Sequence, residues 1–302
     1  MEKEHPFFSI IVPTYNRQRK LTACLKSIAF LDYPNNRFEV IVVDDGGKTS
    51  LDDVISLFQK QINLTLLKQS HRGPASARNT GASRANGSFL AFTDDDCQLA
   101  PNWLRNFAAY FTTLPDHAIG GRTLNALPDN LYSTASQLVI NYLYTYYNSD
   151  PHHACFLTSN NLALPADRFH TVGGFNTTFP QAAGEDREFC NRWLHHGYRL
   201  IYAQDVIIYH AHDLSFRTFW RQHFNYGGGA YRYHQARAKR GTGRFRPDPK
   251  FYMRLILSPL IQEQGKRALV LTALMMISQI ANAIGFFGKD SKNQREISVG
   301  KG

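Results

Sequence analysis

The amino-acid sequence predicts an α/β fold in which helices flank a mostly parallel sheet. Short apolar stretches alternate with segments of helical periodicity through the first half of the chain, and this alternation is typical of βαβ units. The apolar stretches are nearly continuous runs of Val, Ile, Leu and Phe, as expected for strands that are buried on both faces. Polar clusters follow three of these runs, at the strand ends where open α/β sheets bind ligands.

The chain begins with a predicted strand, helix and second strand. The apolar run over residues 7–12 forms the first strand, and we expect Pro13 to end it. Apolar residues then recur at helical spacing from Leu21 to Leu31. The second strand covers residues 38–43 and is followed directly by two aspartates and two glycines.

The rest of the first half continues the same alternation. Pro74 suits the first turn of a helix, because an amide at that position has no partner within the helix. The predicted elements are a helix over 51–61, a strand over 62–69, a helix over 74–85, a strand over 89–93 and a helix over 101–111.

The second half contains longer helical patterns. Residues 131–147 are rich in tyrosine and predict a half-buried helix, with stacking of the tyrosines on an acceptor sugar as the alternative. Phe189 and Leu194 belong to the apolar face of another helix. Residues 205–210 form a further strand that ends in histidine.

The positive charge of the chain is unevenly distributed. The 302 residues carry a formal net charge of +10, and ten Lys and Arg lie between Arg217 and Arg254 against one acid, Asp248. Such a segment suits the phosphates of a nucleotide or an anionic lipid. Nucleic acid is not an expected partner, because the basic segment matches no nucleic-acid-binding module.

The cysteines and the N-terminal residues indicate a cytoplasmic protein. The four cysteines are far apart and lack the spacing of a metal site, so we expect reduced thiols. The first ten residues lack the apolar run of a signal peptide.

An uncharged apolar segment covers residues 268–288 near the end of the chain. Its length is close to the roughly 20 residues that cross a bilayer, although Gln279 and Asn282 weaken that interpretation. Three interpretations stay open: the segment spans a membrane, lies in the membrane interface, or packs on the domain or on a second subunit as part of a homo-oligomer.

The stretch FLAFTDDDC ends a predicted strand with three adjacent carboxylates, Asp94, Asp95 and Asp96. Carboxylates this close repel one another, and a divalent cation that also binds phosphate oxygens would neutralise them. Asp94 and Asp96 are two residues apart, so an extended backbone would point both the same way. The turn after the first strand has no glycine-rich phosphate motif. The alternative is a solvated turn whose aspartates cap a helix.

Five segments together resemble glycosyltransferase family 2: SIIVPTYNR, VIVVDDGG, GPASARNTGAS, FLAFTDDDC and GGFNTTFPQAAGEDREFCNRWLHHGYRL. They occur in the family's order and at its typical distances, over roughly residues 7–235. The resemblance implies a GT-A fold and transfer of a sugar from a nucleotide-sugar with inversion, usually with Mg²⁺ or Mn²⁺.

The resemblance also implies which residues bind the donor. In such proteins the turn after the first strand and the acids after the second strand hold the nucleoside. The implied nucleotide-sugar site consists of Pro13, Thr14, Tyr15, Asp44, Asp45, Arg78, Asp94, Asp95 and Arg221. The implied metal ligands are Asp96, Asp94 and His212, and the alternative for His212 is an ordinary core or loop histidine.

The acceptor side follows from the second half of the resemblance. Asn160, Asn161 and Trp193 are implied on the acceptor side. Asp186 matches the family's catalytic base, with Glu185 as the second candidate; an inverting transfer needs one carboxylate to take the acceptor's proton. Acids in a first helical turn also favour the helix dipole, which is the alternative explanation.

The sequence therefore predicts a glycosyltransferase that moves a sugar from a nucleotide-diphosphate-sugar to an acceptor hydroxyl in polysaccharide, lipopolysaccharide or other glycoconjugate synthesis. We expect a GT-A domain over residues 1–240, with a nucleotide-sugar half to about residue 125, and a basic linker and apolar helix over 241–302. The expected location is the cytoplasm, at the inner face of the membrane if the helix associates with it. The alternatives are a catalytically silent nucleotide-sugar or glycan-binding protein of the same fold and a sugar nucleotidyltransferase.

Overall fold

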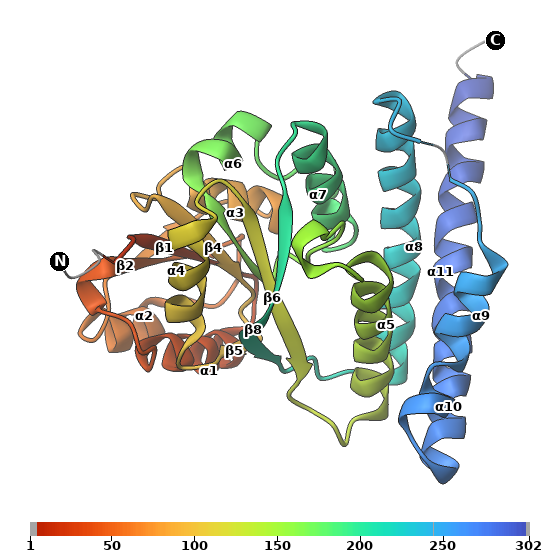
Figure 1. Ribbon diagram of the computed structural model, residues 1–302, viewed down its shortest axis with the longest axis horizontal. Helices are drawn as coiled ribbons and strands as arrows, with labels where there is room; N and C mark the ends of the chain where they lie inside the picture. Colours follow the sequence, from red (N-terminus) through yellow and green to blue (C-terminus); the bar gives the residue numbers. More distant parts are fainter. Residues whose placement is uncertain (1–4, 244, 300–302) are drawn as a thin grey trace.

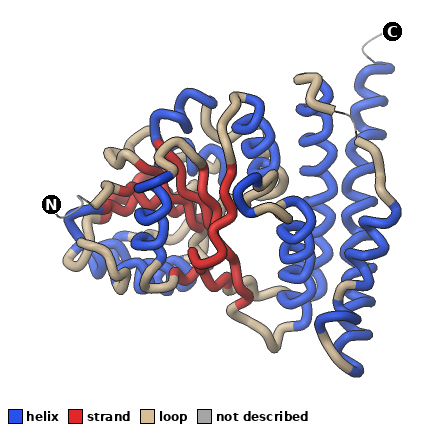
Figure 2. The backbone as a smooth tube through the Cα atoms, viewed as in Figure 1, coloured by secondary structure: helices blue, strands red, loops and turns tan. Residues whose placement is uncertain are grey.

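An eight-stranded sheet forms the centre of the computed structural model, which describes residues 5–243 and 245–299 and their side chains as far as residue 288 (Figures 1 and 2). The strands are β1 (Phe8–Thr14), β2 (Phe38–Asp44), β3 (Leu64–Lys68), β4 (Phe89–Thr93), β5 (Cys97–Leu99), β6 (Ala118–Asn125), β7 (Asn161–Pro165) and β8 (Leu200–His210). The α-helices are α1 (Gln18–Ala29), α2 (Asp52–Gln59), α3 (Pro74–Ala82), α4 (Trp103–Thr113), α5 (Leu131–Tyr147), α6 (Ala166–Val172), α7 (Glu185–His195), α8 (Phe216–Lys239), α9 (Pro249–Leu257), α10 (Pro259–Gln262) and α11 (Gly265–Val299). Short 3₁₀ turns occur at Asn35–Arg37 and Pro151–His153.

The strand order is β3-β2-β1-β4-β7-β6-β8-β5. The strands β3, β2, β1 and β4 are parallel, whereas β7 runs antiparallel to both β4 and β6. The α/β prediction with a mostly parallel sheet flanked by helices is confirmed. Because β4 of the predicted nucleotide half pairs with β7 of the predicted acceptor half, both halves contribute to one sheet.

Pro13 does not end the first strand, contrary to the sequence prediction. β1 continues through Pro13 to Thr14 in register with β2, where Pro13 lies opposite Val43. The pairing of β1 with β4 stops earlier, at Ile11. The strand therefore has one paired neighbour at Pro13 instead of two, and such a position tolerates a residue without an amide proton. The prolongation carries Thr14 to the edge of the sheet where the acids lie.

The sheet is buried on both faces. Successive residues of β1 alternate between two cores: Ile10 belongs to the cluster with α1, α2 and α4, and Ile11 to the cluster with α3, α6 and α7. Since neighbouring side chains of a strand point to opposite faces, both must be apolar. This explains the continuous apolar runs in the sequence.

The helices α8 and α11 lie side by side at one end of the molecule, with α5 between them and the sheet (Figure 1). The segment Gly265–Gly288 is long and apolar enough to cross a membrane, with a mean hydropathy of 1.8, and 33% of the residues in its 18-residue apolar window are buried by the described protein. One face of α11 packs on α8 and α5, while Leu269, Ile280 and Phe287 are exposed.

The contact between α8 and α11 depends on glycine. A Cβ atom added at Gly285 would lie 1.9 Å from the carbonyl oxygen of Phe224. We expect Gly285→Ala to lower the free energy of unfolding by about 1–3 kcal/mol, because the helices must separate to admit the methyl group. Gly288→Ala is the matched control, since its Cβ would meet nothing within 4 Å. Urea denaturation of both variants measures the difference, and equal stability would contradict backbone contact between the helices.

His223 on α8 makes the stability pH-dependent. It is fully buried, and neither ring nitrogen has a hydrogen-bond partner among the described residues. Burial lowers the pKa of His223 to about 4, whereas an unfolded histidine titrates near 6.5. The unfolded chain therefore binds a proton that the folded protein does not, and the contribution of His223 to the free energy of unfolding should fall by about 2–3 kcal/mol as the pH drops from 7 to 4.5.

Urea denaturation at pH 7 and pH 4.5 checks this prediction. In His223→Leu the difference in the free energy of unfolding between pH 7 and pH 4.5 should decrease by about 2–3 kcal/mol. Leucine fills the same apolar surroundings but has no titratable group. A decrease in stability of unchanged size in His223→Leu would contradict the assignment to this histidine.

Candidate active site

Asp94, Asp95 and Asp96 lie at the carboxyl end of β4, as the sequence predicts, but they form a turn instead of an extended segment. The strand ends at Thr93, and the amide of Cys97 donates a hydrogen bond to the carbonyl of Asp94. The expectation that Asp94 and Asp96 point the same way is therefore wrong. The turn directs each carboxylate to a different set of partners.

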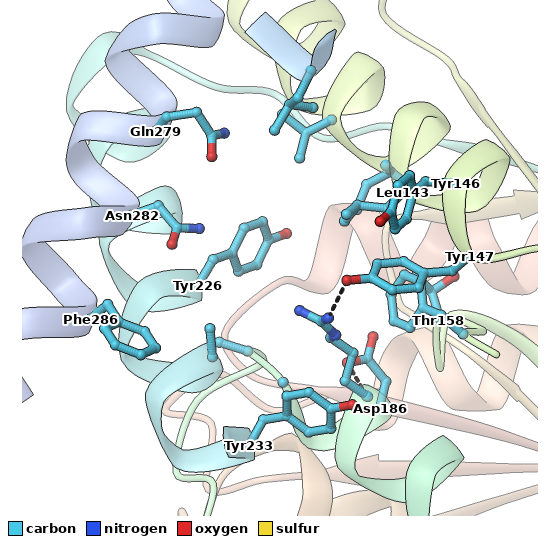
Figure 3. Close-up of a pocket in the computed structure, with 18 of the residues that line it drawn as sticks. Leu143, Tyr146, Tyr147, Thr158, Asp186, Tyr226, Tyr233, Gln279, Asn282 and Phe286 are labelled. Atoms are coloured by element: carbon cyan, nitrogen blue, oxygen red, sulfur yellow. Dashed lines mark hydrogen bonds between the residues drawn. The ribbon is translucent and has the colours of Figure 1, made fainter. Parts of the chain in front are cut away.

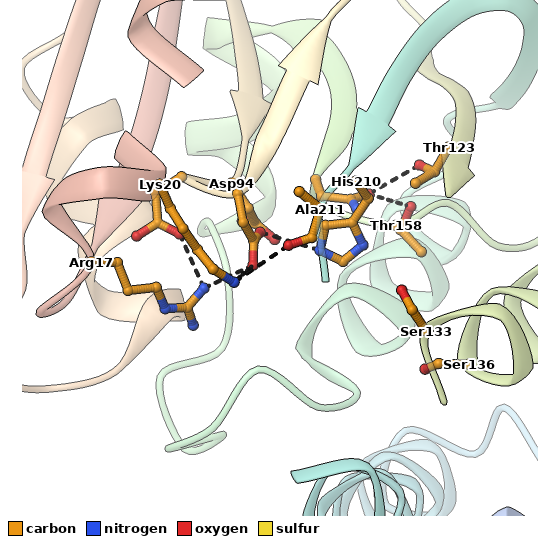
Figure 4. Close-up of polar contacts among 12 residues, drawn as sticks. Arg17, Lys20, Asp94, Thr123, Ser133, Ser136, Thr158, His210 and Ala211 are labelled. Atoms are coloured by element: carbon orange, nitrogen blue, oxygen red, sulfur yellow. Dashed lines mark hydrogen bonds and ion pairs between the residues drawn. The ribbon is translucent and has the colours of Figure 1, made fainter. Parts of the chain in front are cut away.

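Asp95 and Asp96 share one cation. Arg17 donates hydrogen bonds of 3.0 Å to both carboxylates, and the Lys20 ammonium lies 3.1 Å from Asp96 (Figure 4). The hydroxyl of Thr14 donates to Asp95 over 2.7 Å. Burial raises the pKa of Asp95 to about 6, against the opposing effect of Arg17.

Asp96 also contacts a histidine of β8, a strand that is separated from β4 by β7 and β6 in the sheet. The Nε2 atom of His210, at the end of β8, lies 3.2 Å from the Asp96 carboxylate. Burial alone would raise the pKa of Asp96, but His210, Arg17 and Lys20 outweigh it and hold that pKa well below its usual range. Asp96 is consequently an anion at neutral pH.

Asp94 is linked to Glu185 through a buried arginine. Arg78 of α3 is 1% exposed, and its guanidinium donates to Asp94 over 2.6 Å and to Glu185 over 3.0 Å. Burial and the neighbouring Asp186 raise the pKa of Glu185 to about 7, although Arg78 opposes the shift. Arg78 therefore ties the acids at the end of β4 to the start of α7.

Asp186 occupies the first turn of α7, directly after Glu185. Its carboxylate accepts a hydrogen bond of 2.7 Å from the amide of Arg187, and burial raises its pKa. Glu185 is buried, whereas Asp186 is half-buried. Of the two acids, Asp186 is the more accessible to a ligand.

A cavity of about 810 Å³ connects these acids with the C-terminal helices (Figure 3). Asp94, Arg78, Glu185, Asp186 and His210 line its inner part. Side chains from α5, α8 and α11 surround the remainder, and Figure 3 shows Tyr226 directed into the space between them. The volume lies near the upper end of the range for small-molecule pockets, about 300–1,000 Å³.

The predicted nucleoside residues surround the ends of β1 and β2. Tyr15 stacks on His71 with ring centroids 4.2 Å apart. Asp45 is buried and accepts hydrogen bonds from the amides of residues 72 and 73 and from the side chain of Gln69, while Asp44 accepts from the amide of residue 47. In this structure both aspartates hold neighbouring loops, and Tyr15 is 40% exposed.

The predicted acceptor residues do not all face the cavity. Asn160 lines it, but Asn161 is 0% exposed, accepts from the Trp103 indole and donates to the carbonyls of residues 122 and 206. Trp193 is buried in the core beneath α7, with its indole bonded to the carbonyl of residue 199. Arg221 is exposed and does not line the cavity. The prediction that Asn161 and Trp193 face the acceptor is therefore wrong, because both side chains are buried in the core.

The residues suited to hold a divalent metal are Asp96 and His210. Among the described residues, possible ligand atoms of Asp96, Cys97 and His210 lie within 4.8 Å of one another. Burial and nearby carboxylates raise the pKa of Cys97 well above its usual value, so it offers no thiolate. The carboxylate suits Mg²⁺ or Mn²⁺, and the imidazole is a ligand typical of divalent transition metals. His212, predicted as a ligand, lies against His210 with ring centroids 4.8 Å apart and ring planes tilted by 38°.

Comparison with family models identifies the chain. The model of glycosyl transferase family 2 matches residues 9–171, more than half of the sequence. The chain belongs to glycosyl transferase family 2. A second model, described as the N-terminal domain of galactosyltransferase, matches residues 149–213 of this glycosyltransferase, the part that contains Asp186 and His210.

Curated relatives of this glycosyltransferase act in different contexts. The glycosyltransferase AglE of Haloferax volcanii is 27% identical over 226 residues, covering 74% of this chain and 73% of AglE. A validoxylamine A glucosyltransferase of Streptomyces hygroscopicus is 28% identical over 220 residues, covering 64% of this chain and 49% of the relative. The poly(ribitol-phosphate) β-N-acetylglucosaminyltransferase TarS of Staphylococcus aureus is 35% identical over 105 residues, but this chain covers only 18% of TarS.

Solved structures confirm the fold. The mannosyltransferase PcManGT of Pyrobaculum calidifontis, solved with GDP-Man and Mn²⁺, superposes with a TM-score of 0.67 at 21% identity and covers 94% of this chain and 88% of its own. Residues 1–349 of S. aureus TarS with UDP-GlcNAc give a TM-score of 0.53 at 17% identity, covering 96% and 92%. These structures show the GT-A type of α/β fold, and the family match together with the curated relatives makes the chain a nucleotide-sugar glycosyltransferase.

Arg17 and Lys20 are among the residues of the site that were not predicted from the sequence. Arg17 and Lys20 precede the apolar face of α1, and in the sequence they look like ordinary surface cations. Their role depends on the fold, which brings the start of α1 to the turn after β4 (Figure 4). The sequence feature that could have indicated this role is the basic segment RQRK, which directly follows PTYN at the predicted end of the first strand.

Proposed function

We propose that this glycosyltransferase moves a sugar from a nucleotide-diphosphate-sugar to an acceptor hydroxyl with inversion, using Asp186 as the catalytic base. The observation that carries the proposal is the cavity, because Asp94 and Asp186 line the same inner part of it. A donor beside Asp94 and an acceptor beside Asp186 would meet there.

The reaction requires one proton acceptor on the acceptor side. Asp186 accepts the hydroxyl proton while the acceptor oxygen attacks the anomeric carbon from the side opposite the diphosphate. Its half-buried carboxylate and raised pKa support this role. Glu185 is less suited, because one of its oxygens is bonded to Arg78 and the group is buried.

The donor site would use the edge formed by β1, β2 and β4. Thr14, Tyr15 and the loops held by Asp44 and Asp45 are positioned for the nucleoside, and Arg17 supplies positive charge close to the expected diphosphate. Donor and metal types are suggested by the complexes of the neighbours with GDP-Man and Mn²⁺ and with UDP-GlcNAc. A divalent metal held by Asp96 and His210 would act as a Lewis acid toward the leaving diphosphate.

The acceptor would belong to a polysaccharide, lipopolysaccharide or other glycoconjugate at the cytoplasmic side of a membrane. Exposed apolar side chains of α9–α11, among them Met253, Leu257, Leu260 and Leu269, form a surface bordered by Lys250 and Arg254. Apolar side chains flanked by cations suit an anionic membrane surface. A second copy of the chain on the same surface is the alternative. Flotation of the purified protein with anionic liposomes distinguishes membrane binding from dimerisation.

Thermal unfolding with nucleotides tests the proposed function. We would measure the melting temperature with UDP, GDP, TDP, CDP and ADP, each with and without Mn²⁺. A ligand raises the melting temperature only when it prefers the folded state. A metal-dependent rise with one nucleotide that is lost in Asp96→Ala supports the proposal and identifies the donor class. The absence of any rise would contradict it and favour a glycan-binding protein of the same fold.

A further inference from the structure

The outer part of the cavity is apolar. Beyond the acids its lining includes apolar side chains from three helices beside the sheet. They are Leu143 of α5, Leu255 and Ile256 of α9, and Met276, Ile280 and Phe286 of α11. A single acceptor sugar would leave this surface in contact with water. Because uncovered apolar area is unfavourable, the lining indicates a ligand with a hydrocarbon part.

The cavity is open on the side of α11. Met276, Ile280 and Phe287 line it and yet are 50%, 49% and 62% exposed. These residues continue into the exposed apolar surface of α9–α11. A long chain can therefore enter between the helices along these apolar side chains, beside the amides of Gln279 and Asn282.

The inner end of the cavity carries a cation beside the proposed base. Arg187 interacts electrostatically with its neighbour Asp186, and among the described residues its guanidinium forms no salt bridge to a carboxylate. Its guanidinium donates to the hydroxyl of Tyr147 over 2.9 Å and lies over the rings of Tyr147 and Tyr233. Figure 3 shows the Tyr147 contact beside Asp186. The remaining donors of Arg187 are available to an anionic group next to the base.

Further charges are distributed along the lining. Arg237 and Arg246 face the cavity, and the described acids there besides those of the active site are limited to Asp248, which caps α9 through the amide of residue 250. Arginine binds phosphate oxygens well because its planar group can donate two hydrogen bonds at once. The cavity therefore combines the proposed base, the arginine next to it and an apolar lining.

We infer that the acceptor is an amphiphile: a hydroxyl-bearing headgroup joined through a phosphate to a long apolar chain, with the phosphate at Arg187 and the chain between α5, α8, α9 and α11. This inference rests on the proposed function, since it places the headgroup hydroxyl at Asp186. That hydroxyl loses its proton to Asp186, its oxygen forms the new bond to the anomeric carbon, and the nucleoside diphosphate leaves with the electrons of the broken bond.

Simple alkyl phosphates probe the site without knowledge of the headgroup. We would titrate the full chain calorimetrically with butyl phosphate, dodecyl phosphate and the neutral dodecyl maltoside, each below its micellar concentration. A buried methylene is worth up to about 0.8 kcal/mol, or about fourfold in affinity. We expect dodecyl phosphate to bind at least 100-fold more tightly than butyl phosphate.

Two alanines of α11 give a matched pair of variants. Both are exposed, but Ala283 lines the cavity and Ala273 does not. Ala283→Trp should weaken dodecyl phosphate binding at least tenfold because the indole occupies the space for the chain, and Ala273→Trp should leave it unchanged. Arg187→Gln should weaken dodecyl phosphate at least tenfold and leave dodecyl maltoside unaffected.

Any one of three results would overturn the inference. The first is equal affinity for butyl and dodecyl phosphate, and the second is an equal effect of Ala283→Trp and Ala273→Trp on dodecyl phosphate binding. The third is an Arg187→Gln variant whose affinity for dodecyl phosphate relative to dodecyl maltoside is unchanged. Nucleoside diphosphate binding with Mn²⁺ is measured on the same samples. Nucleotide binding without alkyl phosphate binding refutes the acceptor inference alone, whereas loss of nucleotide binding in the unmodified chain refutes the proposed function. Retained nucleotide binding in each variant shows that it is folded.

Discussion

Asp186→Asn is expected to lower kcat by about 10²–10⁴-fold, the usual contribution of a general base. Asparagine has nearly the same shape and still accepts the hydrogen bond from the amide of Arg187, so the fold and donor binding should be preserved. The amide cannot take the acceptor's proton. Steady-state kinetics on the amphiphilic or native acceptor, with the melting temperature in nucleotide and Mn²⁺ as a binding control, measures the effect.

Glu185→Gln is the informative comparison because it changes the neighbouring acid in the same way. Glu185 accepts a hydrogen bond from Arg78 and is buried. Compared with Asp186→Asn, Glu185→Gln should therefore cause a larger decrease in the free energy of unfolding and a smaller decrease in kcat. If folded Glu185→Gln had a lower kcat than Asp186→Asn, Glu185 would be the base and Asp186 would not. Full activity of Asp186→Asn would refute the base assignment altogether.

The pH profile gives a second signature of the same residue. The base must be deprotonated to act, and burial raises the pKa of Asp186 above the ordinary value of 3.8. The acidic limb of the kcat profile should therefore lie above that value, with activity falling as the pH drops through the raised pKa. In Asp186→Asn this limb should disappear from the residual activity.

Much of the fold was predictable because its signals are local. The strand at residues 89–93 and the helix at 131–147 occur with the predicted ends, since continuous apolar runs and helical periodicity reflect burial directly. The acids after β4 were found for a related reason, whereas those at the start of α7 were found through the family resemblance. Carboxylates at the end of a buried strand or in a cavity are costly unless they have a role.

The parts that sequence analysis missed depend on tertiary packing. Asn160 and Asn161 are adjacent, but only Asn160 lines the cavity, because neighbouring side chains point in opposite directions where β7 begins. Trp193 shares the helix of Asp186 yet belongs to its buried face. The cavity itself exists only because α11 packs on α8 across Gly227 and Gly285, a contact between residues that are far apart in the sequence.

Arg78 is expected to be the residue whose loss costs the most stability. It is 1% exposed and neutralises both Asp94 and Glu185. Arg78→Met would keep most of the volume but leave Glu185 as a buried carboxylate without a cation. Breaking a buried pair in this way costs about 3–5 kcal/mol, and we expect a loss of that size in the free energy of unfolding at pH 8.

The pH dependence of this loss distinguishes an uncompensated charge from a packing defect. Without Arg78, the already raised pKa of Glu185 should increase further, because burial and Asp186 would act unopposed. The folded variant then binds a proton that the unfolded chain releases, so its stability rises as the pH falls. Urea denaturation of Arg78→Met should show a clearly smaller deficit at pH 5 than at pH 8.

The double variant Arg78→Met with Glu185→Gln supplies the control. It removes the buried charge together with its partner, and the two substitutions should therefore be less destabilising together than the sum of the single losses. Additive losses, or a deficit of Arg78→Met that is the same at both pH values, would mean that Arg78 stabilises the protein by packing. Coupling between the two residues would instead establish that Arg78 stabilises α7 through its charge interaction with Glu185. Because Arg78 also pairs with Asp94, the start of α7 would then be held beside the turn after β4 by one buried cation.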